Sequence, residues 1–232
     1  SIELPQVQRD ILKALKKAGK KVVFVNCSGS AVALVPEIES CDAILQAWYP
    51  GQSGGLAVAD VLFGDFNPSG KLPVTFYKNT DQLPDFEDYS MKNRTYRYMT
   101  EAPLFPFGYG LSYTTFDISK GRLNKKTISA GQDLNFKVNV KNTGKYDGAE
   151  VIQVYVRKVD DAEGPIKSLR AFRRVPLKAG ETCVVSIDLL PTTFEFFDPT
   201  TNTMRIMPGK YEIMYGNSSD IPSGNKLSVT LR

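Results

Sequence analysis

The chain has 232 residues, of which 42% are hydrophobic, and this is enough for a sizeable core in one large domain or two ordinary ones. We expect two. The formal net charge is only +4 and the basic residues are scattered among acidic ones, which argues against a nucleic-acid-binding surface. Histidine is absent, so the commonest general base and the commonest metal ligand are both excluded.

Neither a disulfide framework nor a membrane span is predicted. The three cysteines, Cys27, Cys41 and Cys183, are far apart and odd in number, and we expect buried free thiols. No apolar run reaches the roughly 18 residues that a membrane helix needs. The first residues contain neither the basic region nor the apolar region of a signal peptide, so no such signal is visible in this chain.

Helical and strand patterns alternate in the first half of the chain. Apolar residues at helical spacing follow Pro5 and stop at Gly19, a typical helix C-cap, and a short continuous apolar run comes next, as in a strand buried on both faces. The expected elements, in chain order, are a helix at 5–18, a strand at 22–25, a helix at 31–38, a strand at 43–48, a helix at 54–63 and an extended segment at 71–76. This alternation predicts a mainly parallel α/β sheet.

A long polar and aromatic segment follows, from Lys78 to Pro106. Irregular segments of this length are usually functional loops or wrap around another surface. Within it, the acidic stretch Asp85–Asp88 is expected to be a solvated loop, with contact to a substrate as the alternative.

The period of the apolar pattern changes to two after Phe116. Alternation of apolar and polar residues over 134–140 predicts a half-buried antiparallel strand, and the same rhythm recurs several times between turn signals rich in glycine, proline and asparagine. We expect an all-β sandwich of about seven strands over roughly 117–232. The predicted domains are therefore 1–116, with a parallel sheet and a linker, and 117–232.

Gly51–Gly55 formally matches the G-x-S-x-G nucleophile elbow of α/β-hydrolases and lies between an expected strand and an expected helix. A serine nucleophile needs a base that accepts its proton, and the chain has no histidine for that role. We interpret the segment as a tight turn whose glycines allow unusual backbone angles and close packing. Asn26–Ser30 lacks the G-x-G-x-x-G pattern of a dinucleotide-binding turn, and no pair of acidic residues has a spacing that identifies it as catalytic.

Trp48, Tyr49 and Gln52 are the candidate substrate-binding residues. They follow a predicted parallel strand, and open α/β sheets bind ligands at the carboxyl ends of their strands. The aromatic rings suit stacking on a sugar, with burial against a neighbouring domain as the alternative, and the Gln52 amide suits a hydrogen bond to a sugar hydroxyl.

Several motifs in a linked order resemble the C-terminal portion of glycoside hydrolase family 3, in particular its β-xylosidase and β-glucosidase members. The resemblance covers essentially the whole chain. The segments that carry it are 47–55, 59–64, Asn67–Pro73, Tyr96–Tyr98 and Phe105–Phe116.

The resemblance implies part of an α/β-sandwich domain followed by a fibronectin type III-like, or immunoglobulin-like, β-sandwich. Family members are retaining glycosidases, which use one carboxylate as nucleophile and another as acid/base, without a metal or cofactor. The nucleophile belongs to a preceding barrel domain, and the acid/base residue would fall just before Ser1, so no catalytic residue is expected here and the isolated chain should be inactive. The parent enzyme would be periplasmic or secreted and would take an oligosaccharide or glycoside as substrate.

Two further expectations follow. Apolar surface that the barrel and the earlier strands would cover, including a sheet edge and the tyrosine-rich loop 89–113, should be exposed in the chain alone, and self-association is the expected result. The alternative function is a non-catalytic carbohydrate-binding or structural β-sandwich module, which an exposed row of aromatic residues would favour. The candidates for that row are Phe194, Phe196 and Phe197. The simpler interpretation of Phe194–Phe196 is an ordinary strand whose alternate side chains point into the core.

Overall fold

The computed structural model describes residues 1–232, which fold into two compact units. The first unit comprises Ser1–Phe66, Pro73–Thr95 and Met99–Phe107, and the second comprises Asn67–Leu72, Tyr96–Tyr98 and Gly108–Arg232. The domain boundary expected between residues 116 and 117 stays a prediction. No helix combines the length and the apolar character that crossing a membrane requires.

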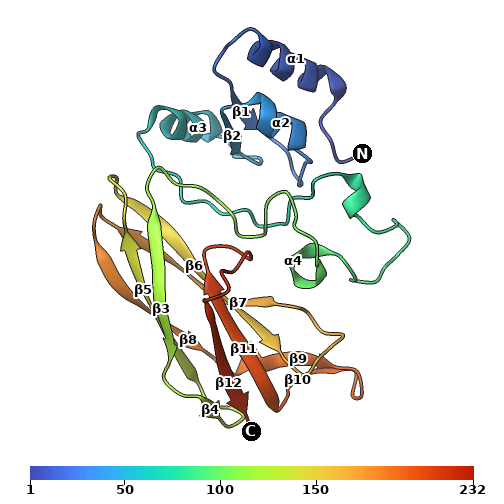
Figure 1. The fold of residues 1–232 in the computed structure, drawn as a ribbon, viewed down its shortest axis with the longest axis vertical. Helices are drawn as coiled ribbons and strands as arrows, with labels where there is room; N and C mark the ends of the chain where they lie inside the picture. The colour runs from blue at the N-terminus through green and yellow to red at the C-terminus, as the bar shows by residue number, and fades with distance from the viewer. The chain divides into compact units, whose positions relative to one another are not determined.

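The first unit contains a two-stranded parallel sheet with helices beside it (Figure 1). Its elements are α1 (Gln6–Lys17), β1 (Val23–Asn26), α2 (Val35–Ser40), β2 (Ala43–Gln46), α3 (Gly54–Phe63) and a 3-10 turn at Thr80–Gln82, and the short helix α4 (Thr95–Tyr98) is divided between the units. Gly64 ends α3 in the left-handed conformation, with φ of 87°, as a C-cap glycine commonly does. The predicted α/β class is confirmed.

Some local expectations for the first unit are wrong. The strands are not buried on both faces, since Val23 is 51% exposed and β2 has no fully buried residue, because a sheet of only two strands has little to cover it. The helix expected from residue 31 begins at Val35, next to Pro36, which favours the first turn. The strand expected to reach residue 48 ends at Gln46, and the segment expected to be extended at 71–76 forms only a single bridge, between Phe76 and Phe105.

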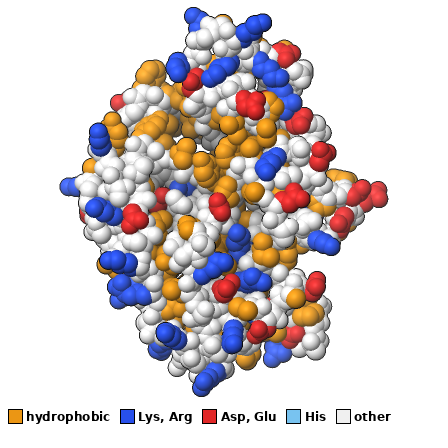
Figure 2. All heavy atoms as spheres, in the orientation of Figure 1, with side chains coloured by type: hydrophobic (Ala, Val, Ile, Leu, Met, Phe, Trp, Pro, Cys, Tyr) orange, Lys and Arg blue, Asp and Glu red, His pale blue; other side chains and the backbone are white.

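Several apolar side chains of the first unit face solvent, as the upper part of Figure 2 shows. Val7, Ile11 and Leu15 recur every four residues along α1 and are all exposed, whereas Leu12 is buried. On α3, Leu56 and Phe63 are also exposed. These faces support the expected self-association, which stays a prediction: light scattering should show particles larger than one chain at high concentration, and a strict monomer would contradict it.

The second unit is a β-sandwich. One sheet has the strand order β4-β12-β11-β6-β7 and the other β3-β5-β8, and β9 and β10 form a separate hairpin. The strands are β3 (Phe116–Leu123), β4 (Thr127–Ile128), β5 (Leu134–Asn142), β6 (Gly148–Lys158), β7 (Ser168–Leu177), β8 (Thr182–Leu189), β9 (Glu195–Asp198), β10 (Thr203–Ile206), β11 (Gly209–Gly216) and β12 (Lys226–Leu231). Seven strands were expected, and eight form the two sheets because the two-residue β4 adds to an edge.

The alternation of buried and accessible residues along β5 follows the predicted period of two. Its inward side chains join a core that both sheets share, in which Phe136 and Tyr215 lie with ring centroids 5.1 Å apart. Phe194 and Phe196 are also buried in this core, around Tyr211, while Phe197 is exposed. These three phenylalanines therefore form no exposed aromatic row on the sandwich.

Candidate functional site

The candidate site lies at the carboxyl ends of β1 and β2 in the first unit. The two strands run parallel in a register that sets Val23 beside Ala43 and Asn26 beside Gln46. The loops that follow both strands therefore leave the sheet at the same edge. Open α/β sheets bind their ligands at such an edge. We refer to it as the β1–β2 edge.

A closed set of hydrogen bonds organises the β1–β2 edge. Asn26 donates its side-chain amide to Gln46 Oε1, at 2.6 Å, and to Ser28 Oγ, at 3.1 Å. Gln46 Nε2 donates to the same Ser28 oxygen at 3.1 Å, and that hydroxyl donates to the Ser30 carbonyl at 2.9 Å. Because these amide and hydroxyl groups bond to one another, the network fixes the loops that leave both strands. Sequence reasoning missed this network, although a polar amide directly after each of two apolar runs was a signal for it.

Trp48 begins the loop after β2 and has an unusual backbone conformation. Its φ is 55°, in the left-handed region that bulky residues rarely adopt. The indole is partly buried and meets the Phe76 ring edge-on, with centroids 6.0 Å apart. Strained backbone of this kind persists where surrounding contacts hold it, often at functional positions. For Trp48, the structure favours a packing role that sets the direction of the loop.

Tyr49 presents its ring at the surface. The residue is 77% exposed, and its ring lies against Gly29 in the loop after β1. A β-carbon added to Gly29 would lie 2.7 Å from Tyr49 Cε2, closer than such atoms approach, so the glycine makes room for the ring. The two loops of the β1–β2 edge therefore meet through this contact.

Gln52 lies exposed in the turn between Tyr49 and α3. The turn depends on glycine at two places, since Gly51 has φ of 73° and a β-carbon on Gly54 would lie 2.5 Å from the Pro50 ring. Gly51–Gly55 is thus the tight turn that its sequence predicts. Trp48, Tyr49 and Gln52 share one loop, with Tyr49 and Gln52 accessible to a ligand.

The acidic residues closest in sequence to β2 form hydrogen bonds or ion pairs away from the β1–β2 edge. Asp42 precedes β2, at the opposite end of the strand, where it accepts hydrogen bonds from the Val22 N–H at 2.9 Å and from Lys21 Nζ at 3.0 Å. The backbone hydrogen bond from Val22, then the Lys21 ammonium, lowers the pKa of the Asp42 carboxyl. Glu37 on α2 is buried and pairs with Arg9 of α1, with Nε and Oε1 3.3 Å apart.

The β1–β2 edge is therefore lined by amide, hydroxyl and aromatic side chains, without a carboxylate among them. Such groups can bond and stack on a neutral polyhydroxyl ligand, but they offer neither the nucleophile nor the acid/base that glycoside hydrolysis needs. No group of three or more Cys, Asp and Glu side chains is arranged to hold a metal ion.

The cysteines are less buried than expected. Cys27 is exposed, and Cys41 and Cys183 are partly buried free thiols. Partial burial raises the pKa of both the Cys41 and the Cys183 thiol, which disfavours the reactive thiolate.

Two family models match parts of the chain. Residues 1–113 match the family model described as the glycosyl hydrolase family 3 C-terminal domain, and residues 150–219 match a fibronectin type III-like domain. A xylan 1,4-beta-xylosidase of Xylanibacter ruminicola is 61% identical over 100% of this chain and 26% of its own length. A periplasmic beta-glucosidase of Salmonella typhimurium is 41% identical over 94% of this chain and 30% of its own length.

Solved structures agree with these matches. A beta-glucosidase from Listeria innocua in complex with isofagomine superposes with a TM-score of 0.85 and 33% identity, over 99% of this chain and 34% of that chain. A beta-D-glucoside glucohydrolase from Trichoderma reesei superposes with a TM-score of 0.86 at 24% identity, a likeness of fold alone. The chain spans about a quarter to a third of the length of these relatives.

Proposed function

The chain belongs to glycoside hydrolase family 3, and we propose on that basis that it is the C-terminal part of a retaining β-glycosidase that releases terminal, non-reducing β-linked xylose or glucose. The relatives named above are xylosidases and glucosidases, and the one with 61% identity over the whole chain is a xylan 1,4-beta-xylosidase. That relative favours a xyloside as substrate. The hydrolytic carboxylates would come from the rest of the enzyme, and the chain alone is inactive.

The observation that carries this proposal is the chemistry of the β1–β2 edge. An exposed tyrosine ring and an exposed glutamine follow a fixed network of amide and hydroxyl groups, where an α/β sheet binds its ligands. Tyr49 would stack on a sugar ring and Gln52 would bond a hydroxyl, while Trp48 would hold the loop that carries both. In this arrangement the chain helps to bind the substrate and another part of the enzyme cleaves it.

Replacing Tyr49 by Ala in the whole enzyme should raise KM for xylobiose up to about tenfold and change kcat little, because a stacked ring contributes about 0.5–1.5 kcal/mol to binding in both the ground and transition states. The control is Tyr146→Ala, which removes an exposed tyrosine from the second unit. Steady-state kinetics of both variants measure the effect. Equal KM values for Tyr49→Ala and the wild type would contradict the role of this ring.

We also propose a periplasmic or secreted location for the whole enzyme, in line with the periplasmic relative from Salmonella typhimurium. Cell fractionation tests this, and recovery of the enzyme from the cytoplasm alone would contradict it. The alternative function, a non-catalytic carbohydrate-binding or structural β-sandwich module, loses its main support, since Phe194 and Phe196 are buried.

A further inference from the structure

A second region of the first unit has features of a ligand site. Residues of the long segment after the parallel sheet surround a pocket of about 290 Å³. This volume is near the lower bound of about 300 Å³ for small-molecule pockets. The lining residues are Asp81, Gln82, Leu83, Pro84, Asp88, Lys92, Asn93, Met99 and Glu101. None of them belongs to the β1–β2 edge.

The lining of this pocket suits a neutral ligand rich in hydroxyl groups. It carries three carboxyl groups against one ammonium group, so its formal charge is negative and a phosphate or another anion is disfavoured. The Asn93 amide adds a donor and an acceptor to the same wall, whereas the Gln82 amide is already bonded to backbone groups of Lys78 and Ala102. The hydroxyl groups of a ligand both donate and accept hydrogen bonds. The carboxylate groups of the lining can accept from them, and the ammonium and amide N–H groups can donate to them.

The loop beside the pocket is held in shape from within. Arg94 donates from Nε to the Ser90 carbonyl at 3.1 Å and from Nη2 to the Asp85 carbonyl at 3.2 Å. The Asp85 carboxylate accepts from the Glu87 N–H at 2.9 Å, and the Asp88 carboxylate accepts from the Ser90 N–H at 2.8 Å. A loop whose polar groups bond to one another presents its remaining side chains in a defined arrangement.

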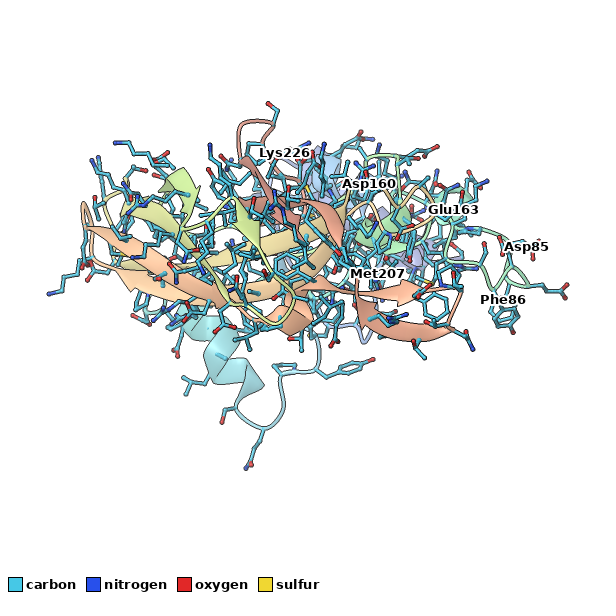
Figure 3. All side chains as sticks on the ribbon, turned by 90° about the horizontal axis from the view of Figure 1, so that it is seen from below. Asp85, Phe86, Asp160, Glu163, Met207 and Lys226 are labelled. Carbon is cyan, nitrogen blue, oxygen red and sulfur yellow. The ribbon has the colours of Figure 1, made fainter.

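Two aromatic side chains rise from this fixed loop into solvent. Phe86 is 92% exposed and Tyr89 is 90% exposed, more than any other large hydrophobic residue of the chain. Phe86 lies between the pocket residues Pro84 and Asp88, and Figure 3 shows its ring at the projecting end of the loop. Packing of the unit does not need these rings, since almost none of their surface is buried. An exposed ring beside a polar pocket is the arrangement that binds a sugar, which has an apolar C–H face and a hydroxyl-bearing edge.

We propose that the pocket and the loop form a carbohydrate-binding site for a β-linked oligosaccharide, separate from the β1–β2 edge. One sugar unit enters the pocket and bonds to Asp88 and Asn93, and neighbouring units stack on Phe86 and Tyr89. The choice of a β-linked oligosaccharide rests on the proposed function, since the relatives act on such sugars. In the whole enzyme the site would help to hold the substrate chain.

Titration of the 232-residue chain with xylotriose and cellotriose tests this site. Calorimetry or NMR should show saturable binding to at least one of them, with a Kd on the order of 1 mM. The double variant Phe86→Ala/Tyr89→Ala should bind at least about tenfold more weakly, and Asp88→Asn should also weaken binding. Phe63→Ala is the matched control, because it removes an exposed phenylalanine from the end of α3, and it should bind as the wild type does. Circular dichroism should show the same fold and melting midpoint for the double variant and the wild type.

Unchanged binding by the double variant would overturn this inference, and so would the absence of any binding by the wild-type chain. Loss of binding in Tyr49→Ala instead would assign the sugar to the β1–β2 edge, so that the proposed function stands and the second site falls. A double variant that changes the oligomeric state but not sugar binding would show that the rings contact protein, which also overturns the site.

Discussion

Replacing Lys71 by Met should lower the free energy of unfolding of the second unit by about 3–5 kcal/mol. Lys71 Nζ lies 2.7 Å from Glu150 Oε1, and the two side chains are only 12% and 6% exposed. The ammonium group also donates to the Gly110 carbonyl at 2.9 Å. Methionine fills similar space but leaves the Glu150 carboxylate buried without a counter-charge, and removing one partner of a buried pair is costly for this reason.

Urea denaturation of the wild type and the variant measures this effect. Arg205→Met is the matched control, because Arg205 is 58% exposed and the Asp198 carboxylate keeps hydrogen bonds from the Thr200 N–H and the Thr201 hydroxyl, and it should cost no more than about 1 kcal/mol. The double variant Lys71→Met/Glu150→Gln should recover part of the loss, since it removes both charges. A cost for Lys71→Met equal to that of the control would contradict the structural role of the pair.

This pair explains one of the motifs behind the family resemblance. The segment Asn67–Leu72 belongs to the second unit, where Asn67 Oδ1 accepts from Ser112 Oγ at 2.9 Å and from the Tyr113 N–H at 2.8 Å. Glycine is required where this segment meets Gly110, because a β-carbon there would lie 2.2 Å from the Gly70 carbonyl oxygen. The role of this motif is therefore structural: it joins the segment 67–72 to the segment 110–113. It has no acid/base chemistry of its own.

Local patterns predict the elements of this chain better than they predict burial. The helix from Gln6 to Lys17 and the alternation along β5 depend on neighbours within the same segment, so the sequence is sufficient for them. The burial of β1 depends on which other strands and helices cover it, and the apolar run that predicts a buried strand contains no information on that. The prediction that Cys27 is buried is wrong for the same reason, since the residue is exposed.

In the candidate site, too, local features could be predicted from the sequence and tertiary contacts could not. The position of Tyr49 and Gln52 after a parallel strand follows from the sequence, since strand ends and glycine turns are local features. The hydrogen bonds of Asn26 to Gln46 and the contact of Tyr49 with Gly29 depend on the register of two strands about twenty residues apart. The backbone of Trp48 lies in the left-handed region and its ring meets Phe76, which is distant in sequence, and neither feature has a local signal.

The purified chain should show no glycosidase turnover. The β1–β2 edge has no carboxylate, Glu37 and Glu150 are buried in ion pairs, and retaining hydrolysis needs two carboxyl groups about 5–5.5 Å apart on either side of the scissile bond. Residual catalysis by positioning alone is not expected, because the β1–β2 edge offers no group that can form the glycosyl–enzyme intermediate.

The most direct test is the release of nitrophenol from aryl β-xyloside and aryl β-glucoside, with the whole enzyme as positive control. We expect the whole enzyme to release nitrophenol and the 232-residue chain to give no more than the buffer blank. Turnover by the pure chain, lost when one of its own acidic residues is replaced by the corresponding amide, would contradict the assignment of catalysis to the rest of the enzyme.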